Sequence, residues 1–569
     1  PAELFVWRRA DRAALVTAVT QCRDALAAGA EPALADLAAS AWQSSRTGVG
    51  QATLAVVATS PADLRDKLAA ALDLLAKPGE AATDPRGIYF AAKPDAGGQV
   101  AFLFPGQGSQ YPDMLAQPAM AFAEVRAVFD AANHALAGRL EKPLGRFVFP
   151  PSPFGPEQEQ HNRKDLQRTE VAQPAIGAAS LGMARLLAAL GVEPDLLAGH
   201  SYGEYTALAA AGALSDEDFL ALSFERGRVI RDVAAGAAGG MVAVDATPAA
   251  LAPLLTGIDG VWVANHNSPH QTVLAGTDAG LTAVTAKLEA AKVRAQRIPV
   301  ACGFHSPLIA GAKAPLAAAL GAAAWSAPQK PVFSNTTAAP HVTEPGAVAR
   351  QLADHLVSPV KFADEIEAMY AAGARVFVEV GPQAVLTGLA GQILAGKPHL
   401  AVASDQKSRP GLVQLCHLIG QLLAAGVPVR LDRLFQGRGV KPFDLAKLSA
   451  DTGKLKPPAT AWVVNGVRSR PVNGPEPRLL GQSIPPTART GPAAAAKPAA
   501  PTPAPPVTPA ALRTSTPAVP TTPRAPMITQ TPTPVPTPSV NGAYRAAPDA
   551  AAQVVLRFQE VMAKFLDTQ

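Results

Sequence analysis

A serine between two glycines is the clearest chemical feature of the sequence. Residues 199–203 read Gly-His-Ser-Tyr-Gly, after an apolar stretch at 196–198 and before a helix-forming stretch at 204–211. In a GxSxG turn between a strand and a helix the serine oxygen is exposed, and the helix N-terminus favours a developing oxyanion. The pattern predicts Ser201 as a nucleophile, although an ordinary βα turn can carry the same residues.

A nucleophilic serine needs a base, and two histidines are candidates. His200 adjoins Ser201, but neighbouring side chains on a tight turn usually point apart, so we expect His200 to support the turn. His305 lies in the segment CGFHSP at 302–307, between a predicted strand end and a proline, where a cleft edge is expected. From its spacing alone, His305 is either the base or a structural histidine.

The elements around these residues predict an α/β fold. Apolar strands at 99–104, 196–199 and 376–380 alternate with helices at 171–190 and 215–234, which favours a hydrolase-like body with a parallel sheet. Within the body, about residues 236–300 form an insert of ferredoxin-like βαββαβ order. Its expected strands are 241–244, 261–264, 271–275 and 294–300, and its expected helices are 248–255 and 279–291.

The first 97 residues form a separate small α/β unit with no residues arranged for chemistry. Because strands and helices alternate there, we expect a parallel sheet. The expected strands are 3–7, 53–58 and 87–91, and the expected helices are 10–28 and 61–75.

The composition changes sharply near residue 471. Residues 471–548 hold 21 of the 55 prolines, with Ala, Thr and Ser and few large apolar residues, and such a stretch predicts a disordered, semi-rigid linker. Residues 549–569 regain helical periodicity, with Val554, Phe558, Val561 and Phe565 on one face. This helix either packs on its own chain or leads into a further domain.

Charge and cysteine content exclude several classes of function. The 50 basic and 45 acidic residues give a net charge of only +5, which does not predict nucleic-acid binding. The three cysteines are far apart and form no metal-binding spacing, so we expect no metal site and a reducing, cytoplasmic location. We expect no apolar run long enough to span a membrane. Because the chain begins Pro-Ala-Glu, we expect it to be a piece of a longer protein.

Six short motifs in one order resemble the malonyl-CoA:acyl-carrier-protein transacylases, in the form found in type I polyketide and polyunsaturated fatty acid synthases. The resemblance covers about residues 98–435 and is specific because the motifs keep their order. The motifs are FPGQGSQ at 104–110, GHSYGEY at 199–205, ERGR at 225–228, NSP at 267–269, FHS at 304–306 and EVGP at 379–382.

The resemblance implies catalytic roles. Ser201 would attack the thioester, and His305 would take its proton and later activate the thiol of the carrier. The family commonly holds this histidine through a backbone carbonyl, which maps to His355 within a residue or two. Gln107 and the N–H of Tyr202 would form the oxyanion hole, where one lost donor costs about 3 kcal/mol.

The resemblance also implies how the substrate is bound. Arg226 would bind the malonyl carboxylate through two hydrogen bonds, whereas the residues alone favour a surface helix charge. Phe304 would fill the space beside the substrate α-carbon and favour malonyl, although residues 302–303 are Cys-Gly where the family usually has His-Ala. Gln173 and Asn267 would line the cleft.

The expected function is transfer of a malonyl group from malonyl-CoA to the phosphopantetheine thiol of an acyl carrier protein, through a ping-pong Ser-acyl intermediate. The partners would be the carrier and the ketosynthase domain of a parent synthase, and no cofactor would be bound by this chain. The alternatives are a serine thioesterase or hydrolase, which has no need of Arg226, and a scaffold segment with a decayed site, which the intact motifs argue against.

The flanking segments also resemble parts of such a synthase. Residues 1–97 resemble the linker between a ketosynthase and its acyltransferase, and 436–470 resemble the start of the linker that follows an acyltransferase. Residues 549–569 would lead towards a carrier region. The ketosynthase cysteine motif and the Gly-x-Asp-Ser attachment site of a carrier do not occur in this sequence.

Overall fold

The structure is a computed structural model of the chain. It describes the following residues: 2–46, 51–235, 239–298, 300, 302–454, 462–464 and 469–471. The chain divides into two units, 1–474 and 475–569, and the described residues all belong to the first. The predicted linker at 471–548, apart from its first residue, and the predicted helix at 549–569 lie outside the described residues.

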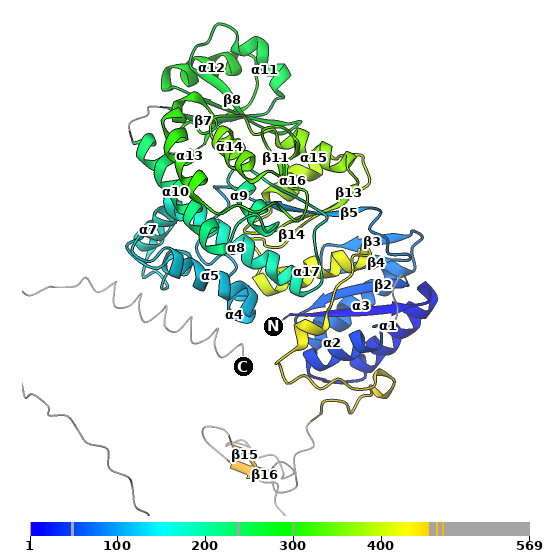
Figure 1. Cartoon of the computed structure of the whole chain (residues 1–569). Helices are drawn as coiled ribbons and strands as arrows, with labels where there is room; N and C mark the ends of the chain where they lie inside the picture. Colours follow the sequence, from blue (N-terminus) through cyan, green and yellow to red (C-terminus); the bar gives the residue numbers. More distant parts are fainter. Residues whose placement is uncertain are drawn as a thin grey trace, which may run out of the picture. The chain divides into compact units, whose positions relative to one another are not determined.

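The N-terminal unit has a four-stranded antiparallel sheet of order β1-β2-β4-β3 (Figure 1). Its elements are β1 (Glu3–Arg9), α1 (Arg12–Ala27), α2 (Leu34–Gln43), β2 (Ala52–Ala58), α3 (Pro61–Leu75), β3 (Ala81–Asp84) and β4 (Ile88–Ala91). The prediction of a parallel sheet here is wrong. Two helices, rather than one, connect β1 to β2, so the chain enters β2 from the opposite end. Helix α2 and strand β3 were not predicted from the sequence.

The body is built on a parallel sheet of order β14-β13-β5-β6. Its strands are β5 (Gln99–Phe104), β6 (Leu196–Gly199), β13 (Ala374–Glu379) and β14 (Leu400–Ala403). Alternate residues of β5 enter two different cores: Phe102 and Phe104 enter one, and Ala101 and Leu103 enter the other. A sheet buried on both faces explains why its strands are continuously apolar.

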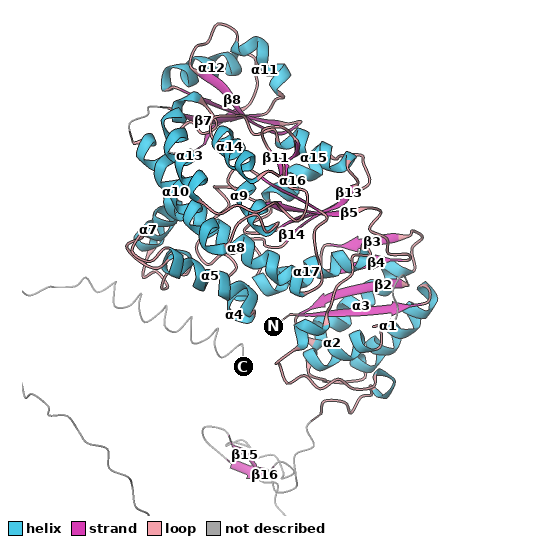
Figure 2. Ribbon diagram, viewed as in Figure 1, coloured by secondary structure: helices cyan, strands magenta, loops and turns pink. Residues whose placement is uncertain are grey.

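Helices cover both faces of the parallel sheet (Figure 2). One face packs on α5 (Ala123–Ala135), α8 (Thr169–Ala189), α9 (Gly203–Ala210) and α10 (Asp216–Ala234), and the other on α15 (Phe362–Ala371) and α16 (Val385–Ile393). Among the described residues, α8 is the one helix that by length and composition could cross a membrane, although Glu170 and Arg185 interrupt its apolar residues. Burial inside the body, which covers 89% of its most apolar window, accounts for its composition.

The insert has the predicted βαββαβ order of elements. They are β7 (Gly240–Val244), α11 (Pro248–Leu255), β8 (Val261–Ser268), β9 (Gln271–Gly276), α12 (Asp278–Ala290) and β10 (Ala295–Ile298). The strands pair antiparallel in the order β10-β7-β9-β8. The helices cover one face of this sheet, while Met241 and Val273 on the other face pack with Phe304.

The remaining elements connect these parts. They are α4 (Ala116–Ala121), α6 (Leu144–Val148), α7 (Pro156–Gln167), η1 (Pro307–Ala312), α13 (Lys313–Ala322), β11 (Phe333–Ser334), β12 (Ala339–Pro340), α14 (Pro345–His355), α17 (Gly411–Ala424), α18 (Asp432–Phe435), η2 (Leu445–Lys447), β15 (Trp462–Val464) and β16 (Ser469–Pro471). Helix α17 packs on the N-terminal sheet, where the side chains of Tyr89 and His417 lie 2.6 Å apart. Arg438 then pairs with Glu3, so the chain returns over the N-terminal unit.

Candidate active site

Ser201 lies on a sharp turn between β6 and α9 that only glycines permit. Its φ of +54° is in the left-handed region, and this conformation is unfavourable for a residue with a side chain. A Cβ on Gly199 would lie 2.0 Å from the carbonyl carbon of Gly203, and one on Gly203 would lie 2.0 Å from the oxygen of Phe104. Both glycines of the motif are therefore required by backbone contact.

His305 lies against the serine as a base would. The Ser201 hydroxyl donates to His305 Nε2 at 2.6 Å. On the other side of the ring, Nδ1 lies 3.1 Å from the carbonyl oxygens of His355 and of Ser358. Because a carbonyl can only accept, Nδ1 carries the proton and Nε2 is free to accept one. The predicted contact with the His355 carbonyl is present, and Ser358 adds a second.

The environment of His305 keeps its imidazole neutral. Burial lowers its pKa well below the usual 6.5, and the nearby His355 and Arg226 lower it further. His200 does not contact the serine hydroxyl; its Nε2 lies 2.8 Å from Asn267 Oδ1, and its ring packs edge-on against Phe362. His200 therefore supports the turn, whereas His305 is placed to accept the serine proton.

Two backbone N–H groups near Ser201 are available to an oxyanion. In the part of the chain that the structure describes, neither the N–H of Gln107 nor that of Tyr202 donates to a protein acceptor. The Gln107 side chain is engaged elsewhere, since its Nε2 donates to Thr169 and its Oε1 accepts from Gln173. Gln173 is fully buried behind Gln107. It does not line the cavity, so the expectation that it would is wrong.

Arg226 on α10 is a buried cation that has no carboxylate partner among the described residues. It is 2% exposed, and its guanidinium lies 5.4 Å from the ring centre of Tyr205 and 6.0 Å from that of Tyr202. No Asp or Glu oxygen of the described residues lies within 4.0 Å of it. Burial lowers its pKa, but an arginine remains charged at neutral pH. The surface-charge alternative from the sequence is therefore wrong.

These side chains meet in one cavity of about 480 Å³ between the body and the insert. Ser201, His305, Arg226, Gln107 and Asn267 all line it. Apolar residues close its insert side: Met241, Val273, Ile298, Val300 and Phe304. The cavity therefore joins a nucleophile, a base and a cation to an apolar wall.

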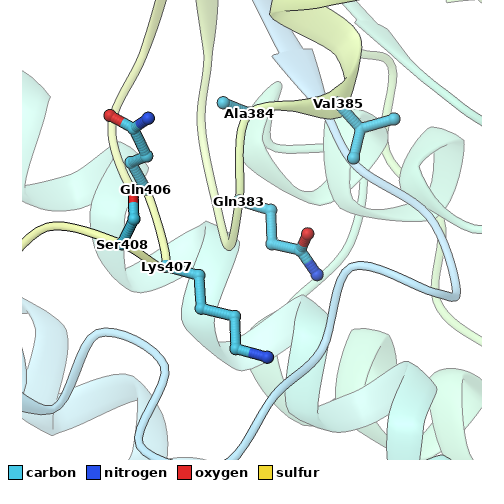
Figure 3. Close-up of a pocket in the computed structure, with 6 residues that line it drawn as sticks. All are labelled: Gln383, Ala384, Val385, Gln406, Lys407 and Ser408. Carbon is cyan, nitrogen blue, oxygen red and sulfur yellow. The ribbon is translucent and has the colours of Figure 1, made fainter.

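A larger cavity, of about 560 Å³, has no such combination. Figure 3 shows its lining residues: Gln383, Ala384, Val385, Gln406, Lys407 and Ser408. It contains no histidine or carboxylate that could serve Ser408 as a base. Within the described residues, no group of three or more His, Cys, Asp or Glu side chains is arranged to hold a metal ion.

Four buried polar residues around the site were not predicted from the sequence. Glu204, Asn335, His341 and Glu365 are at most 6% exposed and are linked by hydrogen bonds behind Ser201. Glu204 belongs to the motif at 199–205, which was the only available signal. The other three have no distinctive local pattern.

Comparison with known proteins agrees with this arrangement. Residues 101–409, more than half of the chain, match the model of the acyl transferase domain family. The chain therefore belongs to this family and is an acyltransferase.

Similar curated proteins are large synthases. A polyunsaturated fatty acid synthase polypeptide of Thraustochytrium sp. (strain ATCC 26185 / S-3) is 34% identical over 355 residues, which are 60% of this chain and 12% of that protein. The spectinabilin polyketide synthase system protein NorB of Streptomyces orinoci is 32% identical over 386 residues, 67% of this chain and 17% of that protein. The chain thus spans less than a fifth of the length of these relatives.

Solved structures of acyltransferases share the fold. The acyltransferase domain of the iterative polyketide synthase in enediyne biosynthesis is 32% identical, with a TM-score of 0.59, and the match covers 77% of this chain and all of that one. The malonyl CoA-acyl carrier protein transacylase of Coxiella burnetii is 30% identical, with a TM-score of 0.51, covering 59% of this chain and 98% of that one.

Proposed function

We propose that this domain transfers a malonyl group from malonyl-CoA to the phosphopantetheine thiol of an acyl carrier protein. The observation that carries the proposal is the buried guanidinium of Arg226, without a protein carboxylate in the described residues, in the same cavity as Ser201 and His305. A buried charge is costly unless it is paired. An acyl group with a free carboxylate, such as malonyl, supplies the missing partner.

The first half-reaction would form an acyl-enzyme. Ser201 Oγ attacks the thioester carbonyl carbon while its proton passes to His305 Nε2, and the N–H groups of Gln107 and Tyr202 stabilise the oxyanion. When the C–S bond breaks, the leaving thiolate of coenzyme A takes the proton from His305. The products are malonyl-Ser201 and free coenzyme A.

The second half-reaction would run the same steps in reverse with a new thiol. The carrier thiol gives its proton to His305 and attacks the Ser201 ester, and the proton then returns to Ser201 Oγ as the C–O bond breaks. In this scheme the chain binds no cofactor of its own, because the carrier brings the phosphopantetheine. A hydrolase would need no cation for the carboxylate, so Arg226 favours transfer from a dicarboxylic acyl donor over simple ester hydrolysis.

The proposal extends to the context of the domain. Its partners would be the carrier and the ketosynthase domain of a multidomain polyketide or fatty acid synthase in the cytoplasm. Residues 1–97 would be the linker from the ketosynthase, 98–435 the acyltransferase and 436–470 the linker that follows. We also propose that the body is hydrolase-like and that the insert is ferredoxin-like. The parallel sheet of the body supports the first description, and the βαββαβ order of the insert supports the second.

The test is intact-mass analysis of the protein after incubation with malonyl-CoA, followed by addition of a carrier protein bearing phosphopantetheine. We expect a malonyl mass gain on the wild type, none on Ser201→Ala, and transfer of the gain to the carrier. The carrier without its phosphopantetheine is the matched control. Release of free malonate at the same rate with and without the carrier would identify a hydrolase instead.

A further inference from the structure

Asn335 lies directly beside the nucleophile turn, although 134 residues separate it from Ser201. It follows the short strand β11, and Val332 just before that strand forms a parallel bridge with Leu197 of β6. The segment therefore runs alongside the strand that carries the turn. Asn335 is fully buried and does not line the catalytic cavity.

The Asn335 side chain holds the turn at two points. Its Oδ1 accepts the backbone N–H of Ser201 at 2.6 Å, and its Nδ2 donates to the carbonyl of Gly199 at 2.6 Å. The second hydrogen of Nδ2 is donated to Glu365 Oε2 at 2.8 Å. Because an N–H can only donate and a carbonyl can only accept, both ends of the amide are specified.

We propose that Asn335 is a positioning residue for acyl transfer. By binding the N–H of Ser201 and the carbonyl of Gly199, it holds Ser201 in its left-handed conformation, with Oγ towards His305. A residue in that conformation persists only where its surroundings hold it. The same contact occupies the N–H of Ser201, so the N–H of Tyr202 is the one on this turn left for the oxyanion.

A buried carboxylate connects this support with that of the base. The N–H of Asn335 donates to Glu204 Oε2 at 3.3 Å, and the same oxygen lies 3.3 Å from Nδ1 of His355. His355 in turn accepts the Nδ1–H of His305 through its carbonyl. Glu204 thus lies between the residue that holds the nucleophile and the residue that holds the base, and His341 binds its other oxygen at 2.5 Å.

The test compares Asn335→Ala with Thr336→Val in the full chain. Thr336 is the next residue, and its buried Oγ1 has no hydrogen-bond partner in the described structure, so it is a matched control for loss of a polar group. Two single-turnover rate constants are measured, each normalised to the fraction of enzyme that reacts. They are malonylation of Ser201 by malonyl-CoA and phosphonylation of Ser201 by an uncharged fluorophosphonate, which has no carboxylate for Arg226.

Misplacing a reacting group by about 1 Å can cost about a hundredfold in rate. We therefore expect Asn335→Ala to lower both rate constants by about tenfold to a hundredfold, with the KM for malonyl-CoA changed by less than about twofold. Thr336→Val should leave both within about twofold of the wild type. A merely structural role would lower the reactive fraction and the melting temperature but not the normalised rate constants.

Wild-type rate constants in folded Asn335→Ala, or a loss confined to the KM for malonyl-CoA, would overturn the inference. If Asn335→Ala does not fold, Asn335→Leu decides, since it is similar in size to Asn335 but removes both contacts with the turn; wild-type rates in that variant would overturn the inference equally. The inference rests on the proposed function only for its malonylation readout. A wild type that reacts with the fluorophosphonate but not with malonyl-CoA would contradict the proposed function alone.

Discussion

Replacing Arg226 with alanine should separate malonyl from acetyl transfer. Arg226 is 2% exposed and has no carboxylate partner among the residues that the structure describes, so a bound malonyl carboxylate would pair with it out of water. Removing one member of a buried ion pair costs about 3–5 kcal/mol. This corresponds to a loss of about 150-fold to 5000-fold in the rate constant for malonylation of Ser201.

The rate of acetyl transfer should not fall when Arg226 is replaced. An acetyl group has no carboxylate, so in the wild type it would lie beside an unpaired guanidinium, and this cost disappears in Arg226→Ala. We expect acetylation from acetyl-CoA to stay at the wild-type rate or to rise. The matched control is Arg228→Ala, because Arg228 on the same helix has a side chain that is 40% exposed and pairs with Glu225 and Asp232. Surface pairs of this kind contribute about 0–1 kcal/mol, so both rates should change little.

The assay is rapid mixing with malonyl-CoA or acetyl-CoA, acid quenching, and intact-mass measurement of acyl-Ser201. Circular dichroism of both variants checks that they are folded. Equal losses with the two donors would mean that Arg226 supports the fold, and malonylation at the wild-type rate would mean that another group binds the carboxylate. Either result would refute the assignment of Arg226 to the substrate.

The cavity wall, the base and the turn can each be tested in the same way. Phe304 should favour malonyl-CoA over methylmalonyl-CoA by about 1–3 kcal/mol, because the extra methyl group overpacks the cavity. This corresponds to about fivefold to 150-fold in rate, and Phe304→Ser should narrow this ratio in a competition between the two donors read by mass; equal loading by the wild type would exclude the role. Because burial holds the pKa of His305 well below 6.5, its neutral form persists as the pH falls, so acylation should be nearly as fast at pH 6 as at pH 8; an acid limb centred at pH 6.5 in single-turnover rates would disagree. Gly203→Ala should abolish acylation and lower the melting temperature, because its Cβ would lie 2.0 Å from Phe104 O, and an active, equally stable variant would show that the turn can open.

All elements of the insert, and some of the body and of the N-terminal unit, could be predicted because each has a local cause. Helix α3 has the predicted bounds, Pro61–Leu75, since Ser60 caps it and proline starts it. Helix α11 likewise begins at Pro248 after the cap Thr247. The direction of the N-terminal strands could not be predicted in the same way. It depends on the number of connecting helices, and α2 gave no start signal because Ala33, the residue before it, has no side chain that caps the helix.

The residues of the candidate site differ in the same way, because some have a local cause in the sequence and others do not. Ser201 was predicted because five consecutive residues, with their own backbone contacts, form the turn. The burial of Arg226 could not be seen in its helix, where charged residues flank it at positions 225 and 228. Whether an arginine on such a helix faces solvent or a cavity depends on what packs against it, here Tyr202 and Tyr205.

The contacts that orient the catalytic groups are the part least visible in the sequence. The carbonyl that holds His305 belongs to His355, 50 residues away, and the amide that holds Ser201 belongs to Asn335, 134 residues away. Neither contact requires a particular neighbour in sequence, and a backbone carbonyl has no residue signature at all. The position of Asn335 beside the turn follows only from the bridge between Val332 and Leu197 of β6, which the sequence does not indicate. A nucleophile can thus be predicted from its own segment, whereas its supports require the tertiary structure, because they belong to strands and helices that only the folded sheet brings next to it.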